Sequence, residues 1–109
     1  MATLTTQTIA LAGLAPTYAA ATGGGDKCEV GDRTFLHVKN GSGSPVTVTL
    51  TATAAVRGQA VANLTVSVPA SGERMIGPLP ADLFQNATDG LCAIGYSSAT
   101  TVTVAALRI

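Results

Sequence analysis

The sequence predicts an all-β fold: one small antiparallel β-sandwich or jelly-roll-like domain of 109 residues. About seven or eight short segments rich in Val, Thr and Ile are separated by turn residues, a spacing typical of sandwiches. In the clearest segments apolar and hydroxyl side chains alternate, as on a strand with one face in the core. One short helical turn is expected at residues 80–84.

The N-terminal quarter predicts a strand followed by an arm. Residues 3–10 are rich in Thr and alternate loosely, which favours a first strand. Residues 13–25 are small, apolar and rich in Gly, without the periodicity of a strand. We therefore divide the domain into an N-terminal strand and small-residue arm (1–25) and a β-sandwich body (26–109). Residues 26–32 are expected to form a polar turn.

Apolar side chains within the arm suggest a role in contacts with a neighbour. Leu11, Leu14 and Tyr18 have little around them in the sequence with which to form a core. We expect the arm to be mobile in the free protein and ordered in an assembly, and these three residues to be interface candidates.

The next segments predict a strand at 34–40, a turn at 41–45 and then a hairpin. The hairpin reverses at Arg57-Gly58-Gln59. The inward residues of its strands are Val46, Val48, Leu50, Ala52, Leu64, Val66 and Val68, and the outward ones are Thr47, Thr49, Thr51, Thr53, Thr65 and Ser67. A flat, uncharged threonine face is unusual on a solvated monomer, so Thr47, Thr49 and Thr51 are further interface candidates.

A block rich in turn residues follows and organises the second half of the chain. Residues 69–72 form a turn, residues 73–76 a strand, and Gly77-Pro78 ends that strand. Pro80 starts a helical turn that places Leu83 and Phe84 in the core. The structural residues of this block are Gly72, Glu73, Arg74, Gly77, Pro78, Pro80 and Phe84.

Arg74 is expected to be structural, with its guanidinium on backbone carbonyls or on the carboxylate of Glu73 or Asp82. Arg74→Lys should then cost about 1–2 kcal/mol of stability. After a turn at 86–90, residues 91–96 and 101–109 predict the last two strands, with Val102 and Val104 inward.

Charge and composition exclude several partners. Charged residues make up 11% of the chain and the net charge is zero. Nucleic acids and anionic membranes attract basic surfaces, so neither is an expected partner. Residues 9–15 are apolar but too short to span a bilayer. A signal peptide requires a basic residue before its apolar run, and no basic residue precedes residue 9.

The sequence offers little catalytic or metal-binding chemistry. His37 is the single histidine, so it has no histidine partner for a metal. Residues 23–25 are three glycines without the Lys-Ser/Thr of a phosphate loop. Asp26, Glu29 and Asp32 lack the spacing of a calcium loop. We expect no enzyme activity, no metal and no cofactor.

Cys28 and Cys92 leave two alternatives open. Cys92 falls in an apolar strand and Cys28 in the expected polar turn, where it would be more exposed. They remain free thiols, bond between subunits, or form a disulfide with each other, which would contribute about 4 kcal/mol in the loop-entropy model.

Three segments carry a resemblance to a known family. They are residues 34–41, residues 66–80 with Phe84, and residues 102–108, and the likeness extends from Thr3 to Ile109. Its most specific part is the Arg-x-x-Gly-Pro-x-Pro block that begins at Arg74. The chain resembles small proteins encoded among the head genes of tailed bacteriophages, especially those of actinobacteria. Cys28 and Cys92 depart from that pattern, where apolar or aromatic residues are expected.

The resemblance implies a virion structural protein: a capsid decoration protein, also called a minor capsid or cement protein. It implies binding to the major capsid protein on the capsid exterior after synthesis in the host cytoplasm. The uncharged threonine face predicts a homo-oligomer, and the resemblance favours a trimer. The alternatives are a phage tail or filament module and a carbohydrate-binding sandwich, although two Tyr, two Phe and no Trp give little platform for sugars.

Overall fold

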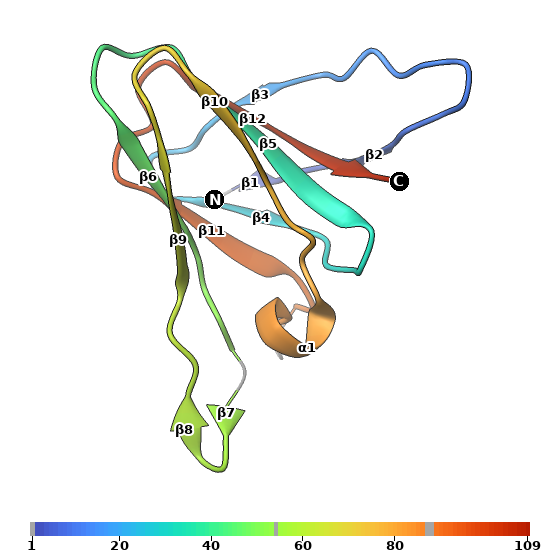
Figure 1. The fold of residues 1–109 in the computed structure, drawn as a ribbon, viewed down its shortest axis with the longest axis vertical. Coiled ribbons are helices and arrows are strands. Elements are labelled where there is room, and N and C mark those ends of the chain that lie inside the picture. The colour runs from blue at the N-terminus through green and yellow to red at the C-terminus, as the bar shows by residue number, and fades with distance from the viewer. Residues whose placement is uncertain (1, 54, 87–88) are drawn as a thin grey trace.

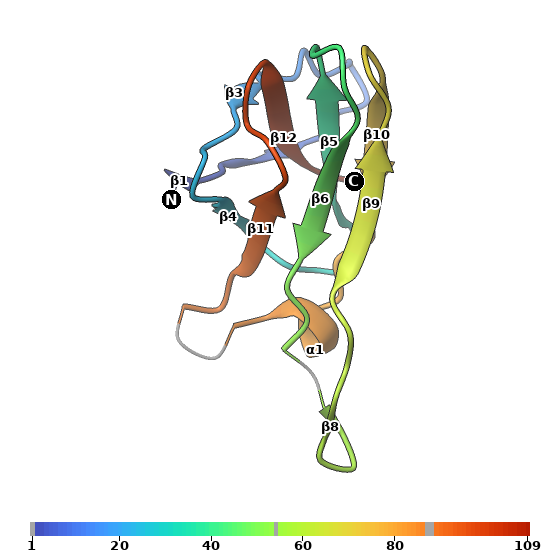
Figure 2. The ribbon, with the colours of Figure 1, turned by 90° about the vertical axis from the view of Figure 1, so that its left-hand side faces the viewer.

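Two sheets face each other in the computed structural model, which describes residues 2–53, 55–86 and 89–109. The β6 sheet has the order β1-β4-β11-β6-β9, and the β5 sheet has the order β10-β5-β12-β2, with β3 also paired to β12. Figure 2 shows β11, β6 and β9 lying in front of β12, β5 and β10. The predicted β-sandwich is confirmed.

The described strands are β1 (Ala2–Thr3), β2 (Thr6–Thr8), β3 (Ala19–Ala20), β4 (Asp26–Cys28), β5 (Thr34–Asn40), β6 (Val46–Leu50), β7 (Ala55–Val56), β8 (Gln59–Ala60), β9 (Leu64–Val68), β10 (Glu73–Ile76), β11 (Cys92–Tyr96) and β12 (Val102–Arg108). One helical turn, α1 (Ala81–Phe84), begins after Pro80, one residue later than predicted. The hairpin β7–β8 extends away from the sandwich, with Arg57 and Gly58 in its turn (Figure 1). The turn predicted at 86–90 includes residues 87 and 88, which lie outside the described residues.

The core lies between the sheets and is built from aliphatic side chains. The largest fully buried ones are Leu36, Leu50, Leu79, Ile94, Val38, Val46, Val48, Val68, Val102 and Val104. The alternation in the sequence explains most of them, because every second residue of β5, β6 and β12 faces inward. Phe84 of α1 is buried at one end of this core, and Leu83 packs against it half-buried, as predicted.

The N-terminal segment departs from the single strand predicted at 3–10. It forms β1, parallel to β4 in the β6 sheet, and then β2, parallel to β12 in the β5 sheet. Leu4, between the two strands, is buried in the core. The segment therefore crosses from one sheet to the other and closes one side of the sandwich. Leu4 is buried because it lies at the crossing point.

Residues 26–28 were expected to begin a polar turn, and that prediction is wrong. They form β4, which lies between β1 and β11. Asp26 and Cys28 face inward and are fully buried, while Lys27 faces outward. The polar composition of this segment favoured a turn, whereas Asp26 faces inward and its carboxylate has partners inside the protein.

The block at 69–84 links the two sheets and carries one close backbone contact. Strand β10 pairs with β5 as far as Ile76 and Leu36. Beyond them Gly77 lies against β5, where a Cβ atom would meet the Phe35 Cβ at 2.5 Å and the Phe35 Cα at 2.9 Å. Leu79 then donates a backbone hydrogen bond to the Thr34 carbonyl at 3.0 Å. Glycine is required here by contact with the backbone of β5.

Gly77→Ala should lower the free energy of unfolding by about 1–3 kcal/mol, because the new methyl group displaces β5 or the chain before Pro78. Guanidinium unfolding of the purified chain measures the change. Gly23→Ala is the matched control, since a Cβ at Gly23 meets nothing within 4 Å. Equal stabilities for the two variants would contradict the structural role of Gly77.

Candidate interaction surfaces and their anchors

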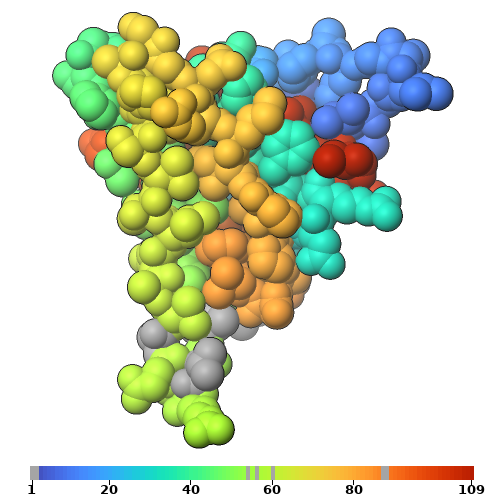
Figure 3. Space-filling view, in the orientation of Figure 1, coloured from blue at the N-terminus to red at the C-terminus, as the bar shows by residue number. Residues whose placement is uncertain are grey.

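The N-terminal loop, residues 9–16, is an exposed segment without a charged side chain. It turns at residues 10–13, where the Gly13 amide donates to the Ala10 carbonyl at 2.9 Å and Gly13 has a φ of 99°. Leu11 at this turn is fully exposed, at 108% of its reference area. Figure 3 shows the segment standing out from the body of the molecule. An exposed leucine on a protruding loop is typical of a contact surface.

The base of the loop is fixed by the side chain of Gln7. Its Nε2 donates to the Thr17 carbonyl at 2.7 Å, and its Oε1 accepts from the Thr17 amide at 2.8 Å. This pair of bonds imitates one rung of a β-ladder and joins the two ends of the loop. This pair of bonds could not be predicted from the sequence, because a glutamine amide has no preferred partner ten residues away.

Tyr18 anchors the loop to the outer face of the β5 sheet. Its hydroxyl lies 2.7 Å from Nδ1 of His37, and the two rings meet edge to face with centroids 5.4 Å apart. The ammonium of Lys39 lies 4.1 Å from the centroid of the tyrosine ring, within the range of a cation–π contact. Tyr18, predicted as an interface residue of a mobile arm, is thus half-buried against its own chain, while Leu11 and the half-buried Leu14 lie in the loop beyond it.

His37 has a structural environment. It is buried, and its Nε2 lies 3.4 Å from the Glu73 carboxylate. Nδ1 faces the Tyr18 hydroxyl and Nε2 faces the Glu73 carboxylate, so each ring nitrogen has a polar neighbour. Both ring nitrogens are used in holding Tyr18 and β10 to β5.

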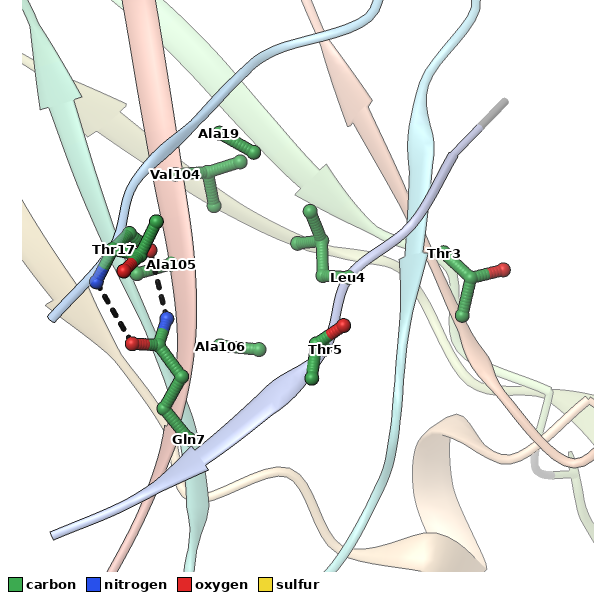
Figure 4. A pocket seen from close by; sticks show the side chains of 9 residues that line it. All are labelled: Thr3, Leu4, Thr5, Gln7, Thr17, Ala19, Val104, Ala105 and Ala106. Carbon is green, nitrogen blue, oxygen red and sulfur yellow. Dashed lines mark hydrogen bonds between the residues drawn. The ribbon is translucent and has the colours of Figure 1, made fainter.

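A shallow cleft of about 370 Å³ lies beside the base of the loop (Figure 4). It is lined by Thr3, Leu4, Thr5, Gln7, Thr17, Ala19, Val104, Ala105 and Ala106. None of these side chains is ionisable, and the Gln7 amide is already bonded to Thr17. The cleft can accommodate an apolar group, and its polar lining consists of threonine hydroxyls and the Gln7 amide.

The threonine face lies on the outer side of β6 and β9, as predicted. Thr47, Thr51, Thr65 and Ser67 are exposed and Thr49 is half-buried. Gly95 of β11 is paired with Thr49, so small side chains continue across the sheet. The face ends at β4, where Lys27 forms an ion pair with Asp89. Its chemistry is that of a flat surface of hydroxyl and methyl groups.

Cys28 and Cys92 are free thiols directly opposite each other on β4 and β11. Both are fully buried, so the expected exposure of Cys28 is wrong. The hydrogen bond with Cys92, and then burial, raise the pKa of the Cys28 thiol above its ordinary value. The pair contributes to the core and presents no nucleophile to solvent.

A buried carboxylate–phenol pair was missed by the sequence analysis. The Tyr96 hydroxyl donates to Oδ2 of Asp26 at 2.8 Å, and the Thr22 amide donates to the same oxygen at 3.2 Å. Burial, and then the hydrogen bond to Asp26, raise the pKa of Tyr96. Asp26, considered above as a calcium ligand, thus faces the interior, while Glu29 and Asp32 are exposed.

Across residues 2–53, 55–86 and 89–109 no three His, Cys, Asp or Glu side chains gather in a way that could hold a metal ion. Within the same ranges no helix has the length and apolarity to cross a membrane.

Arg74 has a smaller role than the sequence suggested. It is exposed, and its Nη1 donates to the backbone carbonyl of the adjacent Glu73 at 2.8 Å. A backbone carbonyl partner was predicted. The described contacts of Arg74 include no carboxylate of Glu73 or Asp82, and one exposed bond to a neighbouring residue does not fix a strand.

Arg74→Lys should therefore change the free energy of unfolding by less than about 0.5 kcal/mol, below the 1–2 kcal/mol expected from the sequence. Thermal unfolding of both proteins measures it. A loss of about 1 kcal/mol or more would restore the organising role of the guanidinium.

Tyr96 should make stability fall at alkaline pH. Its raised pKa means that the unfolded chain releases the phenolic proton near pH 10, while the folded protein retains it. Stability from the protonated hydroxyl is complete below pH 10 and declines above it, by up to about 1.4 kcal/mol per pH unit. Guanidinium unfolding at several pH values measures this slope.

Tyr96→Phe is the companion variant. It should remove this part of the alkaline slope and lower stability at neutral pH by about 1–3 kcal/mol, because buried Asp26 loses a donor. An unchanged slope in Tyr96→Phe would show that other groups cause the alkaline loss.

Comparison of the chain with protein-family models, with curated proteins and with solved structures found no match.

Proposed function

We propose that this chain is a non-enzymatic structural protein of a virion, which decorates and stabilises a bacteriophage capsid by binding the major capsid protein. The observation that supports a coat role is the pair of uncharged, exposed surfaces: the N-terminal loop and the threonine face. The phage capsid, its exterior as the location and synthesis in the host cytoplasm rest on the family resemblance.

The N-terminal loop is suited to a protein partner. Covering a side chain the size of Leu11 is worth about 1.5–3 kcal/mol of hydrophobic free energy. Because Gln7 and Tyr18 fix both ends of the loop, less conformational entropy is lost on binding than for a free arm. A repeating capsid lattice then adds many such modest contacts.

The described ionisable groups of the sandwich are mostly engaged in structural contacts. Asp26 bonds to Tyr96, His37 to Tyr18, and Lys27 to Asp89. These contacts hold strands and loops together, and they fit a rigid body that supports exposed loops and faces.

A carbohydrate-binding role finds less support. Sugar sites stack rings on exposed aromatic side chains, whereas Tyr18 and Tyr96 are half-buried and their hydroxyls are bonded to His37 and Asp26. A tail or filament module would use the same two uncharged surfaces, so particle imaging must separate it from a capsid role.

The proposal is tested by electron microscopy of particles assembled with and without this chain. Extra density over the capsid shell is expected with the wild-type chain. Leu11→Asp, and Thr49→Lys combined with Thr51→Lys, should each reduce occupancy at least about tenfold, because a charge is desolvated on binding.

Thr100→Lys is the matched control, since Thr100 is an exposed threonine in the turn before β12. It should bind as the wild type does. Density confined to the tail would favour the alternative module, and full capsid occupancy by all variants would contradict the use of these surfaces. The trimer implied by the resemblance stays a prediction.

A further inference from the structure

Strand β9 (Leu64–Val68) is an unguarded edge of the β6 sheet. It pairs on one side with β6, through every residue from Leu64 to Val68, and ends the strand order on the other side. Its sequence, Leu-Thr-Val-Ser-Val, contains no charge, no Pro and no Gly. Figure 1 shows it along the front of the molecule. Edge strands usually carry charges, Pro or bulges that prevent pairing with another chain.

The hydrogen bonds of β6 show which backbone groups of β9 face outward. The Ser97 amide donates to the Thr47 carbonyl at 2.9 Å, on the β11 side of β6. Because alternate residues of an antiparallel strand direct their amides and carbonyls to opposite sides, Val46, Val48 and Leu50 bond toward β9. Their register partners Val68, Val66 and Leu64 therefore bond back to β6.

Thr65 and Ser67 thus direct their N–H and C=O groups away from the sheet. Both residues are exposed. The alternate side chains of β9, which point to the other face of the sheet, are apolar: Leu64 is 40% exposed and Val66 is half-buried. The edge therefore offers backbone donors, backbone acceptors and an apolar strip together.

The other sheet edges in the described ranges are protected or short. Strand β10 carries Glu73 and Arg74 and is followed by Gly77-Pro78. Strands β1 and β2 have two and three residues. Among these edges β9 is the longest that carries no charge.

We propose that β9 pairs with β9 of a second copy, antiparallel about a two-fold axis at Val66. In that register Thr65 faces Ser67 of the partner subunit, and the two exchange both of their outward backbone hydrogen bonds. Leu64 lies opposite Val68 of the partner subunit, so its exposed surface is covered.

The second copy is the preferred occupant because the edge is self-complementary. A two-fold contact requires each donor to meet an acceptor on the same surface of its partner, and the Thr65–Ser67 pair meets that condition at both ends. The pairing joins the two five-stranded sheets into one continuous sheet. The threonine faces of both copies then form one wider surface.

This inference rests on the proposed coat role only for the biological purpose of the contact. It identifies a second copy of the chain as the partner of the β9 edge. The contact alone produces a dimer, unlike the trimer implied by the resemblance. Both tests use the isolated 109-residue chain, so they can fail while decoration of particles succeeds, and the reverse.

The first test measures register with introduced cysteines. Val66 faces its own copy across the axis in a non-hydrogen-bonded pair, whose Cα separation of about 4.5 Å suits a disulfide. Val66→Cys should form a covalent dimer when a small disulfide such as oxidised glutathione is added. Thr65→Cys is the control, because the two introduced thiols lie diagonally apart at roughly 8 Å between Cα atoms.

Preferential cross-linking of Val66→Cys supports the register, and equal or reversed yields overturn it. The native thiols do not interfere, since Cys28 and Cys92 are fully buried. Wild-type protein treated in the same way shows whether they contribute.

The second test measures mass by sedimentation equilibrium. The wild type should approach twice the chain mass of 10.8 kDa as concentration rises. Thr65→Pro removes one outward N–H from each copy, and proline is tolerated at such edge positions. It should weaken association at least about tenfold, whereas Thr65→Val, which keeps the N–H, should associate like the wild type.

Circular dichroism checks that Thr65→Pro remains folded. If it is unfolded, the cross-linking result decides. A wild-type mass of one chain at all concentrations, a trimer mass, or undiminished association of folded Thr65→Pro would each overturn the two-fold contact.

Discussion

The structure depends on the backbone pairing of β12, which has neighbours on both sides. Every residue from Val102 to Arg108 pairs with β5 on one side. On the other side β12 pairs with β2 over residues 106–108 and with β3 over residues 103–104. The loop leaves the sheet between these two pairings, so β12 determines both where the loop begins and where it returns.

Buried polar groups then connect parts of the chain that are distant in the sequence. Asn40, fully buried, donates from Nδ2 to the carbonyls of Ser44, Val68 and Pro69. It thereby holds the turn after β5 against the turn after β9, and each of these turns connects one sheet to the other. A chain with few aromatic side chains obtains part of its specificity from such bonds, which tolerate little variation in geometry.

The sequence predicted those parts of the fold that local alternation determines. Strands β5, β6 and β12 bury at least every second residue, whereas β9 and β10, at the sheet edges, bury only Val68 and Ile76. Alternation could not show that residues 2–8 belong to two different sheets, because parallel pairing with β4 and β12 depends on residues far along the chain. Alternation also could not predict the burial of Asp26, because Tyr96, which stabilises that carboxylate, lies 70 residues away.

The exposed loop and the threonine face could be anticipated because composition alone reveals uncharged segments. The anchors could not. Tyr18 is fixed by His37, and Thr17 by Gln7, through side-chain geometry that has no sequence motif.

Joining the two ends of the loop by Gln7 and Thr17 has a consequence for engineering. The rest of the fold depends only on the positions of those two ends. The pairings of β2 and β3 with β12 also hold the ends in place. Doubling the number of residues between them adds only about 0.6 kcal/mol of closure entropy. The segment between Thr8 and Thr17 can therefore be lengthened with little loss of stability, so the length of the loop and the stability of the fold can be changed independently.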